Sequence, residues 1–171
     1  VEKLLHRAIT NDINGEAEAN LFDNAYISFM DIYNKNMCVK SVCYPGVREG
    51  IDYLKEKNFI IGCVTNKNSR FVRPILEKLG LIDDMRIIIA GDTLPKKKPD
   101  PLPLLHAASF FRTDPKKSLM IGDSVNDVKA ARAANFQIVC VSYGYNHGND
   151  ILDSNPDAII DSLADLPKLF D

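Results

Sequence analysis

Short, unbroken apolar runs separated by helical stretches constrain the fold of this chain more than any other feature. The runs lie at residues 59–64, 86–90, 118–121, 137–141 and 157–160. A strand with one wet face alternates apolar and polar residues, whereas a strand covered on both faces is apolar throughout. Because these runs alternate with helical patterns, they predict an α/β fold built on a doubly wound, Rossmann-like parallel sheet with right-handed crossovers.

Apolar residues at helical spacing predict the helices between these strands. Helices are expected over residues 47–54, 72–79, 102–111, 125–134 and 162–170. Gly80 stands where a helix C-terminus favours a glycine in the left-handed conformation. Pro74 fits the second of these helices poorly unless that helix starts late or kinks.

The first forty residues differ from the rest because their pattern predicts helices and no strand. A polar break at residues 11–15 separates a short helix from a longer one. An aromatic stripe runs along the longer helix: Phe22, Tyr26, Phe29 and Tyr33. Such a stripe is more often packing between helices than a ligand surface. A turn signal at residues 44–46 follows, so we expect two units, residues 1–42 and 43–171.

Composition and charge exclude several classes of protein. Apolar residues make up 46% of the chain, the net charge is −2 and the pI is near 5.9, which argues against a nucleic-acid or anionic-membrane surface. No apolar run approaches the ~20 residues of a membrane helix, and no signal-peptide pattern is visible. The cysteines form no C-x-x-C pair and the histidines are scattered, so no zinc site is predicted. A reduced, cytoplasmic setting is expected.

Three polar fragments begin where a predicted strand ends or close a loop nearby. Thr65 and Asn66 follow the first strand, and residues 122–127 follow the third strand. Lys98 is the last of three consecutive lysines in a loop and is followed by Pro99 and Pro101. Because the carboxyl ends of parallel strands share one edge, where ligands bind, these fragments are expected to converge. A hydroxyl, an ammonium and two carboxylates could there bind one small anionic ligand and a metal ion.

Each fragment also has a purely structural interpretation. Ser124 and Asp127 can form a capping box at the start of a helix, although that does not explain Asp123, whose carboxylate suits Mg²⁺. Thr65 and Asn66 can bind phosphate oxygens or equally form a turn and a helix cap. Lys98 can neutralise a phosphoryl group or belong to a solvated basic loop. The loop at residues 142–148, which includes His147, can flank a substrate or be plain surface.

The order and spacing of Thr65, Lys98 and residues 122–127 resemble the second, third and fourth motifs of the haloacid dehalogenase superfamily of phosphohydrolases. Four short phrases are most similar to its bacterial phosphoglycolate phosphatase branch: residues 44–47, 64–67, 97–101 and 142–146. The resemblance covers nearly the whole chain. It implies Mg²⁺-dependent hydrolysis of 2-phosphoglycolate to glycolate and phosphate through an aspartyl-phosphate, and it makes residues 1–42 part of a small helical cap. Relatives that act on another small phosphate ester or on pyrophosphate share the same motifs.

The resemblance also implies a role for each residue. Asp123 holds Mg²⁺, and Asp127 supports the metal site without binding the ion or positions Lys98. Thr65 and Asn66 bind the transferring phosphoryl group, and Lys98 offsets its charge and takes part in catalysis with Thr65. The expected partner is a small phosphorylated metabolite, with no nucleic acid and no membrane, and the protein is expected to be a monomer or a homodimer.

One departure from the family is serious. The first motif, a strand ending in Asp-x-Asp-Gly-Thr that supplies the nucleophile and the acid/base aspartate, has no counterpart in this sequence. In the family, that strand is the central strand of the sheet. It lies between the two strands that correspond to residues 59–64 and 118–121 of this sequence. We therefore expect the central strand to be missing here and the intact protein to carry it upstream of Val1. As given, the chain could instead be an inactive α/β module that binds Mg²⁺ and phosphate, and a receiver-like signalling domain is a weaker alternative.

Overall fold

The structure, a computed structural model, describes residues 1–146, 148 and 150–170. The chain forms two compact units, Val1–Lys40 and Ser41–Asp171, which are described separately. This division lies near the expected boundary, and the assignment of residues 1–42 to a cap stays a prediction. In the described ranges, no helix combines the length and the apolar composition that crossing a membrane requires.

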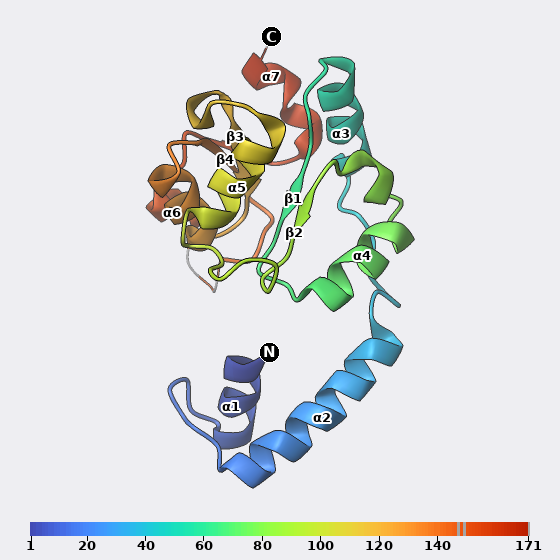
Figure 1. Ribbon diagram of the computed structural model, residues 1–171, viewed down its shortest axis with the longest axis vertical. Helices are drawn as coiled ribbons and strands as arrows, with labels where there is room; N and C mark the ends of the chain where they lie inside the picture. The colour runs from blue at the N-terminus through green and yellow to red at the C-terminus, as the bar shows by residue number, and fades with distance from the viewer. Residues whose placement is uncertain (147, 149, 171) are drawn as a thin grey trace. The chain divides into compact units, whose positions relative to one another are not determined.

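The first unit is a pair of helices that contact each other, α1 (Glu2–Thr10) and α2 (Ala19–Asn36) (Figure 1). The aromatic stripe of α2 takes part in that packing, because the Phe22 ring stacks on His6 of α1 at 4.2 Å between ring centroids. Further along α2, the rings of Phe29 and Tyr33 stack on each other at 5.6 Å. The interpretation of the stripe as helix packing is therefore confirmed for Phe22.

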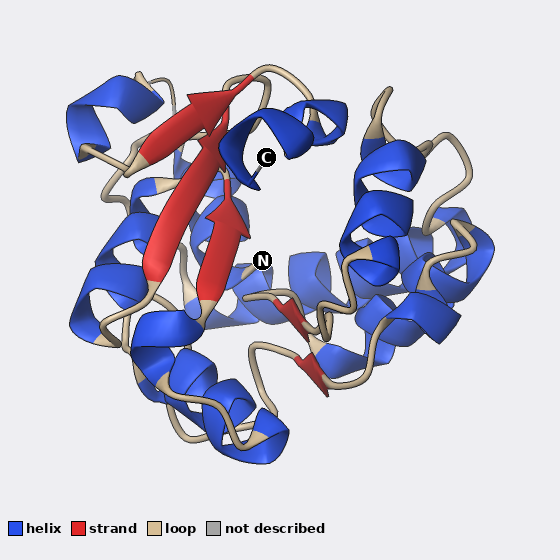
Figure 2. Cartoon of the chain, turned by 90° about the horizontal axis from the view of Figure 1, so that it is seen from above, coloured by secondary structure: helices blue, strands red, loops and turns tan. Residues whose placement is uncertain are grey.

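The second unit contains parallel strands in two separate groups (Figure 2). One sheet joins β1 (Cys63–Val64) to β2 (Ile88–Ile89). The other has the order β3-β4-β5, with β3 (Leu119–Gly122), β4 (Gln137–Val141) and β5 (Ala158–Ile160). All pairs are parallel, as the apolar runs predict. Within the described residues, β1 and β3, the expected neighbours of the missing central strand, do not pair with each other.

Helices cover both faces of the larger sheet, which explains why its strands are apolar throughout. The helices of this unit are α3 (Val47–Glu56), α4 (Ser69–Lys78), α5 (Leu102–Phe111), α6 (Val125–Ala133) and α7 (Pro167–Phe170). On β4, Ile138 and Cys140 pack into one core with α5 and α6. Val139 and Val141 pack into another with Leu54 of α3 and Leu166 beside α7. This alternation confirms the doubly wound α/β architecture.

Three predicted elements differ clearly from those observed. The strand expected over residues 86–90 is reduced to β2 (Ile88–Ile89). The strand expected over residues 59–64 is reduced to β1, because only its β2 side has a hydrogen-bonding neighbour, and Ile60 is 61% exposed. The helix expected over residues 162–170 is broken into the 3₁₀ turn Leu163–Asp165 and α7. Further 3₁₀ turns span Ile82–Asp84, Pro115–Lys117 and Ile151–Ser154.

The end of α4 follows the prediction made for Gly80. Gly80 has φ of +67°, its N–H donates to the carbonyl of Glu77, and the N–H of Leu81 donates to the carbonyl of Leu76. These two bonds make a Schellman motif, which satisfies carbonyls that the helix end leaves free. Pro74 lies inside α4, which begins at Ser69 and not after the proline.

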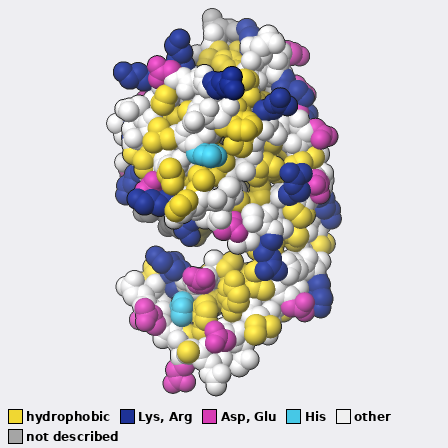
Figure 3. All heavy atoms as spheres, in the orientation of Figure 1, with side chains coloured by type: hydrophobic (Ala, Val, Ile, Leu, Met, Phe, Trp, Pro, Cys, Tyr) yellow, Lys and Arg dark blue, Asp and Glu magenta, His cyan; other side chains and the backbone are white. Residues whose placement is uncertain are grey.

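Surface apolar side chains occur on both units (Figure 3). In the first unit they include Leu21, Ile27 and Ile32 along α2, and in the second they include Phe110 at the end of α5. Scattered exposed apolar residues are usual on protein surfaces and by themselves indicate no function.

Candidate functional site

A buried ion pair joins two of the predicted site residues. Lys98 Nζ lies 2.7 Å from Asp127 Oδ1 and donates a hydrogen bond of 2.6 Å to the carbonyl of Val64 at the end of β1. Lys98 is 8% exposed and Asp127 is 4% exposed. A solvated basic loop does not bury its ammonium group, so this interpretation of Lys98 is wrong. The pair links the carboxyl end of β1 to the start of α6, which follows β3.

The loop that carries Lys98 is held by its own hydrogen bonds. Asn66 Nδ2 donates to the carbonyl of Lys98 at 2.7 Å. Asp100 pairs with the neighbouring Lys96 at 3.0 Å and accepts a hydrogen bond from the N–H of Leu102, the first residue of α5. The Asn66 amide therefore helps to hold the backbone of Lys98 in place, and its predicted binding of phosphate stays a prediction.

Asp127 uses both carboxylate oxygens within the protein. While Oδ1 faces Lys98, Oδ2 accepts hydrogen bonds from the N–H groups of Asp123 and Ser124, both at 3.1 Å, and from Ser124 Oγ at 2.8 Å. Gly122 makes room for this arrangement, because a Cβ there would lie 2.5 Å from Asp127 Cβ. The capping box expected from the sequence is therefore present. Asp127 combines that structural role with direct contact to Lys98.

The electrostatic balance at Asp127 favours its ionised form. Burial opposes ionisation, but the charge of Lys98 and the hydrogen bonds from Lys98, Ser124 and Asp123 outweigh it, so the pKa of Asp127 lies below its ordinary value. Since both oxygens already have partners, Asp127 has little capacity left to bind a metal ion directly. Its contacts suit the support of Lys98.

Asp123 has a different environment from Asp127. It is half-buried, its Oδ2 accepts a hydrogen bond of 3.0 Å from the N–H of Tyr145, and its Oδ1 accepts none from the described residues. The described residues contain no group of three His, Cys, Asp or Glu side chains that could hold a metal ion. Mg²⁺ binds through one or two carboxylates together with waters and phosphate oxygens. Asp123 fits one carboxylate of such a site.

Thr65 directly follows the residue whose carbonyl binds Lys98. Its N–H donates to the carbonyl of Ile89 on β2, and its Oγ1 accepts a hydrogen bond of 3.2 Å from the N–H of Lys67. The helix-cap interpretation does not apply to Thr65 or Asn66, because Asn68 caps α4. The structure thus brings Thr65, Lys98, Asp123 and Asp127 to the same carboxyl edge of the strands.

Sequence reasoning missed Asn146, which is 7% exposed and lies beside this edge. Its Oδ1 accepts a hydrogen bond of 2.9 Å from the N–H of Val125, the first residue of α6. An amide in the loop after a strand, on the expected ligand edge, was the available signal. For the loop at residues 142–148 the sequence predicts either a segment that flanks the substrate or plain surface, and His147 lies outside the described residues.

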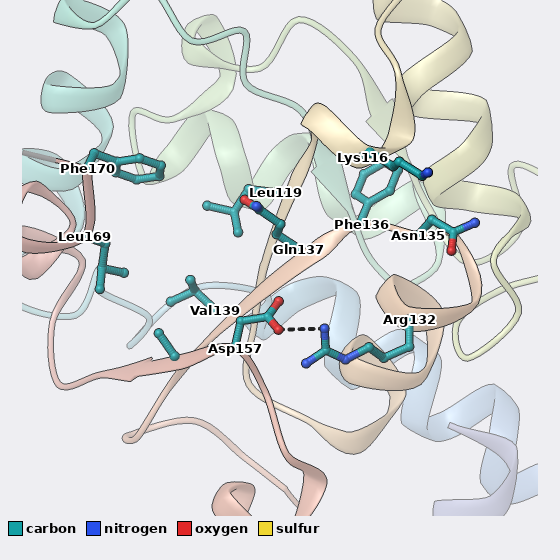
Figure 4. A pocket seen from close by; sticks show the side chains of 11 residues that line it. Lys116, Leu119, Arg132, Asn135, Phe136, Gln137, Val139, Asp157, Leu169 and Phe170 are labelled. Carbon is teal, nitrogen blue, oxygen red and sulfur yellow. Dashed lines mark ion pairs between the residues drawn. The ribbon is translucent and has the colours of Figure 1, made fainter.

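Two hollows on the second unit differ in how close they lie to the predicted site residues. One of about 570 Å³ lies at the amino ends of β3 and β4 and is lined by residues such as Lys116, Phe136 and the ion pair of Arg132 with Asp157 (Figure 4). None of the predicted site residues lines it, so it is not assigned to the site. Another, of about 680 Å³, is lined by residues on either side of Lys98 in its loop, but not by Lys98 itself: Gly91, Pro95, Lys96, Lys97, Pro99, Asp100 and Pro101.

Comparisons with known proteins show the family to which the chain belongs. The family model of haloacid dehalogenase-like hydrolases matches residues 5–141. The chain is 56% identical to a phosphoglycolate phosphatase of Nitrosococcus oceani over 99% of this chain and 76% of that protein, and 45% identical to one of Nitrosospira multiformis over 99% and 75%. A crystal structure described as a predicted phosphoglycolate phosphatase from Haemophilus somnus superposes with a TM-score of 0.91 at 34% identity, covering 98% of this chain and 76% of that one.

The family model matches most of the chain, and the chain is 56% identical to a relative of which it covers 76%. The chain belongs to the haloacid dehalogenase-like hydrolase family.

Proposed function

We propose that this protein is a Mg²⁺-dependent phosphomonoesterase that hydrolyses 2-phosphoglycolate to glycolate and phosphate. The observation that carries the proposal is the buried pair of Lys98 with Asp127, which lies between the carbonyl of Val64 and the turn that holds Asp123. A buried ammonium at a ligand-binding edge is suited to a substrate with concentrated negative charge. The names of the relatives supply the choice of 2-phosphoglycolate.

Lys98 is assigned to offset the negative charge of the phosphoryl group during transfer. Its ammonium has three N–H donors, and the structure engages it with Asp127 Oδ1 and the carbonyl of Val64. Asp127 keeps Lys98 oriented, and Thr65 Oγ1 binds a phosphoryl oxygen with help from neighbouring backbone N–H groups. Fixed groups of this kind stabilise a transition state without reorganising during the reaction.

Asp123 is assigned to hold Mg²⁺ through the oxygen that accepts no hydrogen bond from the described residues. A bound Mg²⁺ neutralises phosphoryl oxygens and holds them beside a nucleophile. Among the predicted site residues, Asp123 is the carboxylate with an oxygen that no described residue engages, so the remaining ligands would be waters, the substrate phosphate and a carboxylate outside this sequence.

The nucleophile is assigned to an upstream segment, since this sequence contains no Asp-x-Asp pair. The facing edges of β1 and β3 leave backbone groups that a strand between them would pair. An aspartate at the end of that strand would attack phosphorus and release the alcohol, which a second aspartate protonates. Water would then hydrolyse the aspartyl-phosphate and release phosphate.

Phosphate release by the full-length protein tests this function. With Mg²⁺, 2-phosphoglycolate should be hydrolysed faster than other small phosphate esters and pyrophosphate. Lys98→Ala should lower kcat by at least about a hundredfold, because it removes a charge that acts on the transition state. Lys97→Ala is the matched control, since Lys97 is the exposed neighbour of Lys98 and should leave kcat within about twofold.

Three results would contradict the proposal in different ways. Preference for another ester or for pyrophosphate would overturn the substrate and keep the reaction class. Equal activity of Lys98→Ala and the parent would overturn the role of Lys98. Binding of Mg²⁺ and phosphate with no hydrolysis of any ester would make the protein a binding module.

A further inference from the structure

We infer that residues 143–146 form a positioning loop that orients Asp123 for Mg²⁺, with Gly144 and Asn146 as its essential members. This inference rests on the proposed function, because it assigns Asp123 to the metal. It concerns residues that come from the loop after β4, whereas Asp123 follows β3. Neighbouring strands thus supply the carboxylate and the backbone that holds it.

Gly144 lies against the Asp123 side chain so closely that no other residue fits there. A Cβ at position 144 would overlap Asp123 Cβ and lie 2.8 Å from both Cγ and Oδ2 of Asp123. Such contacts are below van der Waals separation, and Asp123 is a short side chain with little freedom to move away. The backbone of Gly144 has no left-handed φ, so alanine is excluded by contact with Asp123 and not by conformation.

Tyr145 binds the same carboxylate through its backbone. Its N–H donates to Asp123 Oδ2 at 3.0 Å, while the Tyr145 side chain is largely exposed. This hydrogen bond holds one oxygen of Asp123, Oδ2, and thereby fixes the direction in which the other oxygen, Oδ1, points. Hydrogen bonds to a ligating carboxylate are the usual means by which proteins orient a metal ligand.

Asn146 ties this loop to the helix that follows Asp123. Its Oδ1 accepts the N–H of Val125 at 2.9 Å and its Nδ2 donates to the carbonyl of Asp150 at 3.4 Å. The N–H of the first helical residue has no partner within a helix, so a buried amide is an effective substitute. Asn146 thus fixes the distance between the loop and the turn that carries Asp123.

The start of the loop is anchored away from Asp123. The N–H of Ser142 donates to the carbonyl of Ile160 on β5, and Ser142 Oγ donates to Asp161 at 2.6 Å. The ring of Tyr143 packs against Tyr44 with 4.4 Å between centroids. A loop held at its start and at Asn146 has little freedom between, which suits a backbone that must keep Asp123 in place.

The first experiment measures Mg²⁺ binding to the full-length protein by titration calorimetry with Mg²⁺ alone. Gly144→Ala should weaken Mg²⁺ affinity by at least about tenfold, the usual loss when support of a metal ligand is removed. Gly80→Ala is the control. It places a side chain on a backbone with left-handed φ, where no other atom lies within 4 Å of the added Cβ, so it should lower the melting temperature without changing Mg²⁺ affinity. A Gly144→Ala protein that melts like the parent and binds Mg²⁺ equally well would overturn the inference.

The second experiment separates positioning from simple support of the fold. Asn146→Ala should raise the Mg²⁺ concentration needed for half-maximal activity severalfold, and it should change kcat at saturating Mg²⁺ by less. Asn146→Asp keeps an acceptor for the N–H of Val125 and should restore most of the parent's Mg²⁺ requirement. Asn68→Ala removes a comparable helix cap, on α4 and not on the loop or the turn that hold Asp123, and should affect stability alone. Equal effects of Asn68→Ala and Asn146→Ala on the Mg²⁺ requirement would overturn the inference.

Failure of the inference is distinguishable from failure of the proposed function. If the parent hydrolyses phosphate esters with Mg²⁺ while both loop variants keep its Mg²⁺ affinity, only the role of the loop is wrong. If the parent binds Mg²⁺ through Asp123 but hydrolyses nothing, weakened binding in the loop variants still supports the loop. If Asp123→Ala binds Mg²⁺ like the parent, both are wrong.

Discussion

The buried pair of Lys98 and Asp127 makes a sharp prediction about stability. The two side chains are only 9% and 6% exposed, so removing one partner leaves a charge in a site that water scarcely reaches. Breaking a buried pair in this way costs about 3–5 kcal/mol. We expect Asp127→Ala to lower the free energy of unfolding by that amount, which includes about 1 kcal/mol for the lost helix cap.

The two halves of the pair should not be equivalent. After Lys98→Met, the Asp127 carboxylate keeps three hydrogen bonds, from the N–H groups of Asp123 and Ser124 and from Ser124 Oγ. After Asp127→Ala, the carbonyl of Val64 is the one partner that the described residues still offer the Lys98 ammonium. Asp127→Ala should therefore be the more destabilising change, and the double variant should be less destabilised than the sum by about 0.5–3 kcal/mol.

Urea denaturation of the parent, both single variants and the double variant measures these free energies. The exposed pair of Asp31 with Lys35, whose side chains are 64% and 71% exposed, is the matched control. Asp31→Ala should cost less than about 1 kcal/mol because a surface pair is screened by water. A loss for Asp127→Ala as small as that for Asp31→Ala would refute the reasoning that burial decides the energy.

Three further predictions follow from single groups. Folding lowers the pKa of Asp127, so the stabilisation from its carboxylate is present above the ordinary value of 3.8 and is lost as the pH falls through the lower pKa of the folded state. The difference in the free energy of unfolding between the parent and Asp127→Ala should therefore stay constant from pH 5 to 7 and narrow below about pH 4. Burial, followed by the charges of Asp127 and Asp123, raises the pKa of Cys140 to about 11, so mass spectrometry should find this thiol alkylated more slowly than Cys43 at pH 8. Gly80→Ala should lower the free energy of unfolding by about 1 kcal/mol in urea, since alanine is strained at φ of +67°; no loss would contradict the Schellman assignment.

The parts of the fold that depend on short stretches of chain were predictable. The strand at residues 137–141 and the helix at residues 102–111 have the expected bounds, because the apolar pattern of each is complete within the segment. The strand at residues 59–64 has an equally apolar pattern, yet only Cys63–Val64 are paired. Whether an apolar run is a full strand depends on neighbours along both edges, which periodicity does not report.

Among the site residues, the motif order identified the segments but not the contacts. Lys96, Lys97 and Lys98 are adjacent and alike in the sequence, and only the fold shows that Lys98 alone is buried against Asp127. Asn66 was predicted to bind phosphate, and its amide also holds the carbonyl of Lys98. The position of Asn146 after a strand is a weak signal, because the sequence does not show that this amide is buried.

By itself, the sequence determined the class of fold, the positions of most elements and the segments whose polar ends meet at one edge of the sheet. The tertiary structure alone decided that Lys98 pairs with Asp127, that Gly144 lies against Asp123, and that Asn146 caps α6. The reason is physical: helix and strand patterns arise from interactions between residues close in the chain. Burial and charge pairing arise between segments that only folding brings together, and they set which polar groups have partners.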